Sequence, residues 1–188
     1  MEVTQKPFAQ INAFAMQNGL ILGVWALLAQ WAIIGSFTYS LLSMVNLFMM
    51  LFAPIMLYLL TKKFRTTVAP TGVFTITQGF LHTILTTVYA STWVAIGVYI
   101  YLTYFDGGYL FDSYVAYFSR PEVKELIEQE DVQMQLTTAL QGMSLEEMIN
   151  GLRCVSPATY AMMIFYGNLM VSPILSLFIA IALKRLKK

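Results

Sequence analysis

Charge is what this sequence lacks most. Only 11% of its 188 residues are Asp, Glu, Lys or Arg, against about 25% in a typical soluble protein. Three stretches carry no charge at all: 55 residues from Pro7 to Thr61, 40 from Thr66 to Phe105, and 30 from Cys154 to Leu183. With 58% apolar residues and a mean hydropathy of +0.66, the chain is not expected to be a nucleic-acid binder, a disordered tail or an ordinary soluble enzyme. The pattern indicates a polytopic membrane protein.

Cysteine and histidine are scarce as well. The single Cys154 cannot form an internal disulfide, and the single His82 has no second His or Cys with which to bind a metal. The sequence also lacks a Gly-rich phosphate loop and the motifs of zinc peptidases and serine hydrolases. We therefore expect no catalytic residues, no metal and no cofactor.

Four segments are long and apolar enough to cross a bilayer, which takes roughly 20 residues of helix. The predicted spans are residues 19–37, 41–60, 73–104 and 158–183. The fold class expected is an all-α integral membrane protein, a four-transmembrane-helix bundle. The first two spans should form a tight hairpin and the first should be retained as a signal anchor, since no cleavage site follows it. The third is about 48 Å long if wholly helical, so it must tilt or project beyond the hydrocarbon.

Basic residues gather beside the ends of these spans. Eight of the eleven would lie on one side of the membrane: Lys6, Lys62, Lys63, Arg65, Lys184, Arg185, Lys187 and Lys188. The segment 105–156, between the third and fourth spans, instead holds nine acids and three bases. The positive-inside rule predicts cytoplasmic N- and C-termini and an extracytoplasmic insert.

The sequence of the insert, residues 105–156, predicts a set of amphipathic helices. After a Gly-Gly break, the aromatic residues of 105–118 suit the membrane interface. Pro121 should begin one helix that Gly142 ends, and Ser144 with Glu147 should form a capping box that opens another. Two interpretations stay open: a lid that docks a partner, or a solvated loop that shields the helix ends.

Only neutral polar groups remain inside the predicted spans. They are Gln30, Asn46, Gln78, His82 and Asn168. Helical spacing places six side chains along one face of the third span: Thr75, Gln78, His82, Thr86, Tyr89 and Trp93. We expect this face to point into the bundle. His82 could serve as an interhelical hydrogen-bonding residue or could bind a ligand or relay protons.

Small residues and prolines suggest where helices approach and bend. Gly19 and Gly23 form a G-x-x-x-G face, and Gly79 gives the third span a similar one, for packing within the bundle or in a homodimer. Pro54 and Pro173 should kink the second and fourth spans. Each proline frees a carbonyl, of Met50 and of Leu169 respectively. His82 and Gln78 could satisfy such a carbonyl in a shallow polar pocket that opens to the inner leaflet.

Several of these features occur together in one known family. They are the Gln17-Asn18-Gly19 entry to the first span, a proline-bearing second span that ends in Lys62-Lys63-Phe64-Arg65, a third span rich in Gly, Thr and Gln, an acidic helical insert and a basic C-terminal tail. In this layout the chain resembles a DUF4199-like family of small four-span bacterial inner-membrane proteins of unknown function. The resemblance implies no catalytic residue. It also implies a likeness to accessory partners of envelope glycan or polyprenyl-phosphate glycosyltransferases.

The function expected is that of a non-catalytic integral membrane subunit or scaffold, and the resemblance implies a role in cell-envelope glycan or polyprenyl-lipid biogenesis. Its expected partners are the lipid bilayer, a membrane-associated glycosyltransferase or other envelope protein, and a second copy in a homo-oligomer, with no nucleic acid. The alternatives are a small oligomeric transporter or lipid-handling protein, with a pocket lined by Gln78, His82 and Asn168, or an external enzyme with a cleft among the insert's acids.

Overall fold

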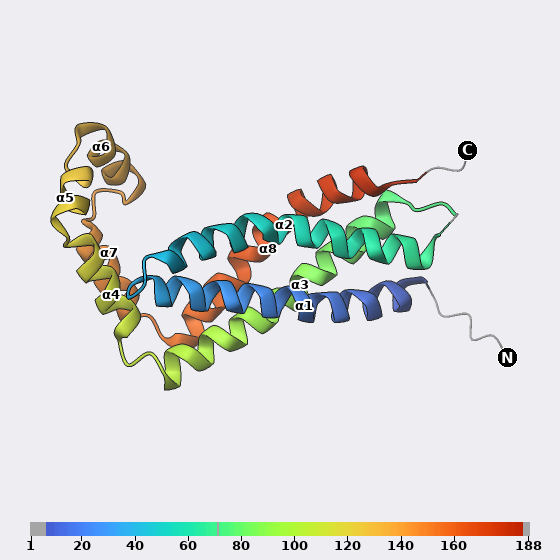
Figure 1. Ribbon diagram of the computed structural model, residues 1–188, viewed down its shortest axis with the longest axis horizontal. Helices are drawn as coiled ribbons and strands as arrows, with labels where there is room; N and C mark the ends of the chain where they lie inside the picture. The colour runs from blue at the N-terminus through green and yellow to red at the C-terminus, as the bar shows by residue number, and fades with distance from the viewer. Residues whose placement is uncertain (1–6, 71, 186–188) are drawn as a thin grey trace. The chain divides into compact units, whose positions relative to one another are not determined.

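The computed structural model describes residues 7–70 and 72–185, and these residues form helices and no β-strand. The helices are α1 (Pro7–Ser36), α2 (Leu41–Val68), α3 (Ile76–Tyr104), α4 (Tyr109–Phe118), α5 (Pro121–Ile127), α6 (Glu130–Ala139), α7 (Leu145–Arg153) and α8 (Pro157–Leu183) (Figure 1). Four of them, α1, α2, α3 and α8, are long and apolar enough to cross a membrane. This confirms the predicted all-α, four-span fold. The predicted topogenic residues Lys6, Lys187 and Lys188 lie outside the described residues.

The chain divides into two compact units. One comprises Met1–Gly97 together with Ala161–Lys188, and the other comprises Val98–Tyr160. The first unit therefore holds most of the four long helices, and the second holds the four short ones.

The long helices extend further than hydropathy predicted, and one begins later. Helix α1 begins at Pro7 rather than near residue 19, and α2 continues to Val68, beyond its basic cluster. Helix α3 begins at Ile76 because Thr75 and Gln78 cap it: the Gln78 N–H donates to Thr75 Oγ1 at 3.2 Å, and the Thr75 N–H donates to Gln78 Oε1 at 2.9 Å. At 30 residues α1 is about 45 Å long, so its ends project beyond a hydrocarbon layer of about 30 Å.

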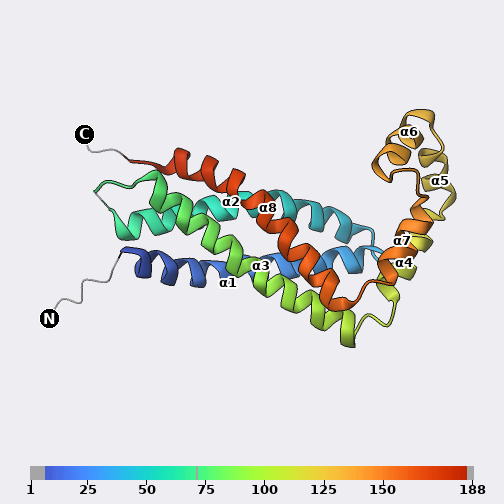
Figure 2. The ribbon, with the colours of Figure 1, turned by 180° about the vertical axis from the view of Figure 1, so that it is seen from behind.

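The predicted hairpin of the first two spans is confirmed. Helix α1 ends at Ser36 and α2 begins at Leu41, and the two helices lie side by side (Figures 1 and 2). Two side chains tie them together through backbone carbonyls. The Trp25 indole donates to the Met49 carbonyl at 2.9 Å, and the Asn46 amide donates to the Ala29 carbonyl at 2.7 Å.

Glycines bring α1 and α3, and α3 and α8, into close contact. A Cβ added to Gly19 would collide with Tyr89, and one added to Gly23 would lie 2.9 Å from the Cβ of Trp93. A Cβ on Gly79 would lie 3.1 Å from the backbone of Ala180 in α8. The G-x-x-x-G face of α1 therefore packs against α3 within the same chain. Helices α1 and α3 also have the largest buried shares of the four spans, as expected of central helices.

The ends of α2 and α8 meet the start of α3. Phe74 and Arg185 exchange two backbone hydrogen bonds of 3.0 and 2.9 Å. The Arg65 guanidinium donates to the Leu183 carbonyl, and the Arg185 guanidinium donates to the Pro70 carbonyl. These bonds satisfy carbonyls at helix ends and bring basic residues from both clusters to one end of the bundle.

The carbonyl freed by Pro173 is satisfied within its own helix. The Ser172 hydroxyl donates to the Leu169 carbonyl at 3.3 Å, which corrects the expectation that His82 or Gln78 would do so. Helix α8 changes direction partway along its length, as a proline-interrupted helix is expected to do (Figure 2).

The second unit begins with a turn built on two glycines. Gly107 and Gly108 have φ of +55° and +93°, a backbone conformation that favours glycine. The buried Asp106 carboxylate accepts hydrogen bonds from the Gly108 and Leu110 amides, at 3.0 and 2.9 Å, and so begins α4. Arg153 of α7 forms a 2.5 Å ion pair with Asp112 of α4. Ile149, one turn before Arg153 in α7, is buried.

The single helix predicted after Pro121 is wrong, because the structure divides it into α5 and α6. The chain is extended at Gln129, where ψ is 131°. Acidic side chains cluster at this break. Acidic side chains are unfavourable at a helix C-terminus and favourable in a first turn. The break is therefore favoured, because it places Asp131 in the first turn of α6.

The predicted capping box of α7 is confirmed. The Glu147 amide donates to Ser144 Oγ at 3.2 Å, and the Ser144 amide donates to the Glu147 carboxylate at 2.8 Å. The hydrogen bond from the Ser144 amide lowers the pKa of the Glu147 carboxyl below its usual value. The cap is therefore complete at neutral pH and weakens as the pH falls through this lowered pKa.

Candidate functional site

His82 lies at the centre of a buried polar network that joins α1, α2 and α3. Its ring is wholly buried. The Asn18 amide nitrogen lies 3.0 Å from His82 Nε2, and Thr61 Oγ1 lies 3.2 Å from His82 Nδ1. Asn18 is buried as well, and Thr61 is fully buried. Three helices are thus held together through both nitrogens of one imidazole.

The hydrogen bonds of this network are all donated in one direction, from Asn18 through His82 and Thr61 to the Leu57 carbonyl. Because the Asn18 amide nitrogen can only donate, His82 Nε2 accepts. Nδ1 then carries the proton and donates to Thr61 Oγ1, whose own hydroxyl donates to the Leu57 carbonyl at 2.9 Å. This is the bonding of a neutral imidazole, with both nitrogens occupied.

Aromatic rings and threonines close the network off. Phe64 stacks on the His82 ring, with centroids 4.2 Å apart and planes 5° apart, and Phe14 and Phe74 pack on Phe64 in turn. Thr83 and Thr86 are fully buried, and their hydroxyls donate to carbonyls one helical turn back. No face of the imidazole is open to a substrate, so the arrangement favours an interhelical lock over a ligand site.

The other polar residues predicted for the spans do not join His82. Gln78 is used in the cap of α3, and Asn46 is bonded to α1. Gln30 is half-buried on α1 and has no hydrogen-bond partner within the described part of the chain. The predicted pocket lined by Gln78, His82 and Asn168 together is therefore not what the structure forms.

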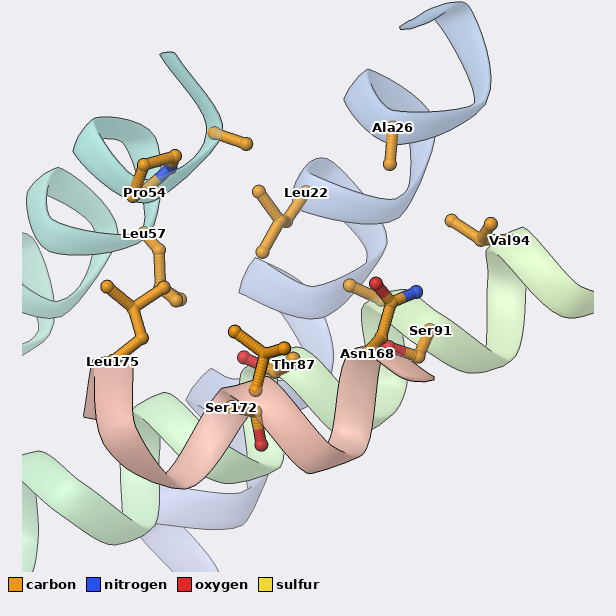
Figure 3. A pocket seen from close by; sticks show the side chains of 13 residues that line it. Leu22, Ala26, Pro54, Leu57, Thr87, Ser91, Val94, Asn168, Ser172 and Leu175 are labelled. Atoms are coloured by element: carbon orange, nitrogen blue, oxygen red, sulfur yellow. The ribbon is translucent and has the colours of Figure 1, made fainter. Parts of the chain in front are cut away.

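Asn168 instead lines a separate groove among the four long helices. The groove has a volume of about 190 Å³, and its lining residues are mostly apolar. They come from α1 (Leu22, Ala26), α2 (Ala53, Pro54, Leu57), α3 (Thr87, Ala90, Ser91, Val94) and α8 (Asn168, Val171, Ser172, Leu175) (Figure 3). The groove lies at the middle of the four long helices, whereas the pocket expected from the sequence was shallow and opened to the inner leaflet.

Two polar side chains in the groove have no hydrogen-bond partner within the described part of the chain. They are Ser91 of α3 and the exposed Asn168 of α8, whereas Thr87 and Ser172 are bonded to carbonyls of their own helices. Asn168 is two residues from Met170, the central residue of α8, so it lies about 3 Å from the helix centre. An unpaired carboxamide at this depth is costly in hydrocarbon.

The second unit holds a groove of its own, of about 270 Å³. Apolar side chains of α4, α5 and α7 line it together with four polar or charged residues, Ser119, Lys124, Ser144 and Glu146. Burial raises the pKa of the hydroxyl of Tyr114, the residue before the groove-lining Val115. Among the residues that the structure describes, no three His, Cys, Asp or Glu side chains gather as a metal site would require.

Sequence reasoning missed Asn18, Thr61 and Ser91. Asn18 precedes Gly19, which packs against α3. Its place next to this glycine was the one sequence feature that could have indicated a contact between Asn18 and α3. Thr61 is the last residue before the basic cluster, so the sequence indicated the end of a span there and gave no sign of a buried hydrogen bond. Ser91 is adjacent to Ala90, the central residue of α3, and nothing in its spacing distinguished it from the helix's other hydroxyl residues.

Replacing His82 tests the lock. His82→Ala leaves the Asn18 amide without its acceptor, removes the donor to Thr61 Oγ1 and removes the ring beneath Phe64, so we expect the free energy of unfolding in micelles to fall by about 3 kcal/mol. Gln30→Ala is the matched control, because that side chain has no partner in the described structure, and its effect should stay within about 0.5 kcal/mol. Wild-type stability of His82→Ala would contradict a structural role for the ring.

One family model, described as a protein of unknown function (DUF4199), matches residues 13–185. The matched range covers most of α1 and every later helix up to the end of α8. No curated protein matches the chain, and no solved structure matches it either. The family match spans nearly the whole sequence, as the resemblance implied. The chain is therefore a member of the DUF4199 family of proteins of unknown function.

Proposed function

We propose that this protein is a non-catalytic integral membrane subunit or scaffold that acts by binding other membrane components. The observation that carries the proposal is how its intramembrane polar groups are used. Those around His82 are buried and bonded to each other, whereas Asn168 stands exposed at the groove with no partner in the described structure. A polar group presented in hydrocarbon favours association with a partner that can hydrogen-bond it.

The groove is a poor fit to the alternative, a transporter or lipid-handling protein. Its volume of about 190 Å³ is close to that of an apolar cavity of about 150 Å³ that holds one benzene molecule. Such a space suits one bulky side chain. A whole lipid would require a much larger cavity than this groove provides.

We place both termini in the cytoplasm and residues 105–156 outside a bacterial inner membrane. The hydrogen bonds of Arg65 and Arg185 support this orientation, because they join the basic ends of α2 and α8. Reporter fusions after Lys188 and at Gln133 should label from opposite compartments. Labelling from the same compartment would contradict this orientation.

The partner class proposed is a membrane-associated glycosyltransferase or another protein of envelope glycan or polyprenyl-lipid biogenesis. Its support is the family resemblance, together with the lack of catalytic motifs in the sequence. An accessory role of this kind requires a stable bundle and an exposed recognition surface, with no reactive group of its own.

Native purification tests the proposed function. We expect the tagged chain, extracted in polymer nanodiscs, to co-purify with an envelope protein in constant ratio, as identified by mass spectrometry. A tagged four-span protein of similar size and expression level provides the control. Repeated recovery of the chain with a stoichiometric lipid and no other protein would overturn the proposal in favour of lipid handling.

A further inference from the structure

We infer that the groove is a contact surface for a second copy of this chain, in which the two Asn168 carboxamides hydrogen-bond to each other. This inference deepens the proposed function and rests on it, because both assign the exposed intramembrane surface to association. It names one occupant of the groove and the side chain that selects it.

The depth of Asn168 argues against a lipid headgroup as its partner. Asn168 and Ser91 lie within about 3 Å of the centres of α8 and α3. Headgroups begin about 15 Å from the centre of a hydrocarbon layer that is about 30 Å thick. The partner of Asn168 must therefore carry a polar group in the middle of the membrane, as the side chain of a transmembrane helix does.

A second copy supplies such a group at the right depth. Two copies with the same orientation are related by a twofold axis along the membrane normal, so a residue near that axis meets its own counterpart. A carboxamide has both a donor and an acceptor, so two Asn168 side chains can satisfy each other. Such side-chain hydrogen bonds stabilise helix association in membranes.

The surface around Asn168 has room for this contact. A Cβ added to the neighbouring Gly167 would meet no atom within 4 Å, so another helix can approach closely there. Val171 lies almost one turn further along and lines the groove while 64% exposed. The groove has the volume to receive one apolar side chain from the second copy.

Asn168 can be replaced without removing a hydrogen bond of the described fold. Its amide has no intramolecular partner there and its side chain is exposed. We therefore expect Asn168→Leu to keep the wild-type Tm while the dimer dissociation constant rises about tenfold, the effect of one interhelical hydrogen bond. Single-molecule photobleaching in vesicles measures this constant. Asn168→Gln, which keeps a carboxamide, should retain most of the dimer.

Cross-linking identifies the face. In a Cys154→Ser background, Val171→Cys should form a cross-linked dimer with a short bis-maleimide in native membranes. Met170→Cys is the matched control, because Met170 lies at the same depth, is 79% exposed and points away from Asn168. Adding Asn168→Leu to Val171→Cys should reduce the cross-linked fraction severalfold.

The outcomes separate this inference from the proposed function. Equal cross-linking from both positions, no cross-linking from Val171→Cys, or a dimer unchanged by Asn168→Leu would each overturn the second copy as occupant. A different protein bound at Asn168 would overturn it as well, while leaving the scaffold proposal intact. A dimer that depends on Asn168 but co-purifies with no other protein would support the inference and count against an envelope partner.

Discussion

The structure depends on one constraint: a polar group in hydrocarbon is costly unless a hydrogen-bond partner satisfies it. The bonds around His82 meet this requirement for Asn18 and Thr61. The Ser172 hydroxyl meets it for the carbonyl that Pro173 frees. Because these polar groups have few alternative partners in a lipid environment, their bonds also specify which helix faces meet.

The same constraint gives meaning to the groups left unpaired. Gln30 of α1 is half-buried without a partner in the described structure, and its surroundings in the bundle partly shield its amide. Asn168 is exposed and lies near the centre of α8. The two carboxamides differ in exposure, and the exposed Asn168 is the one that lines the groove, where a partner can reach it.

Much of the fold could be predicted from the sequence, because charge-free runs and turn residues report on lipid exposure directly. The four spans, the first hairpin and the Ser144–Glu147 cap are of this kind. Helix ends were less predictable, since hydropathy does not register helix that continues into water, as α2 does to Val68. The contact of Asn18 with His82 was beyond reach, because it depends on how α1 and α3 rotate about their axes. That rotation is set by Gly19 and Gly23 packing on α3, where the buried face includes Thr83, Ala90 and Val94 and leaves Trp93 exposed.

The central claim, that His82 is a neutral structural lock, is open to one direct measurement. The chain has a single histidine, so nitrogen-15 solid-state NMR in lipid bilayers reports on this ring without ambiguity. The account predicts one protonated nitrogen, Nδ1, and one bare nitrogen, Nε2, as the bonds to Thr61 and Asn18 require. A ring protonated at both nitrogens, or at Nε2 alone, would contradict it.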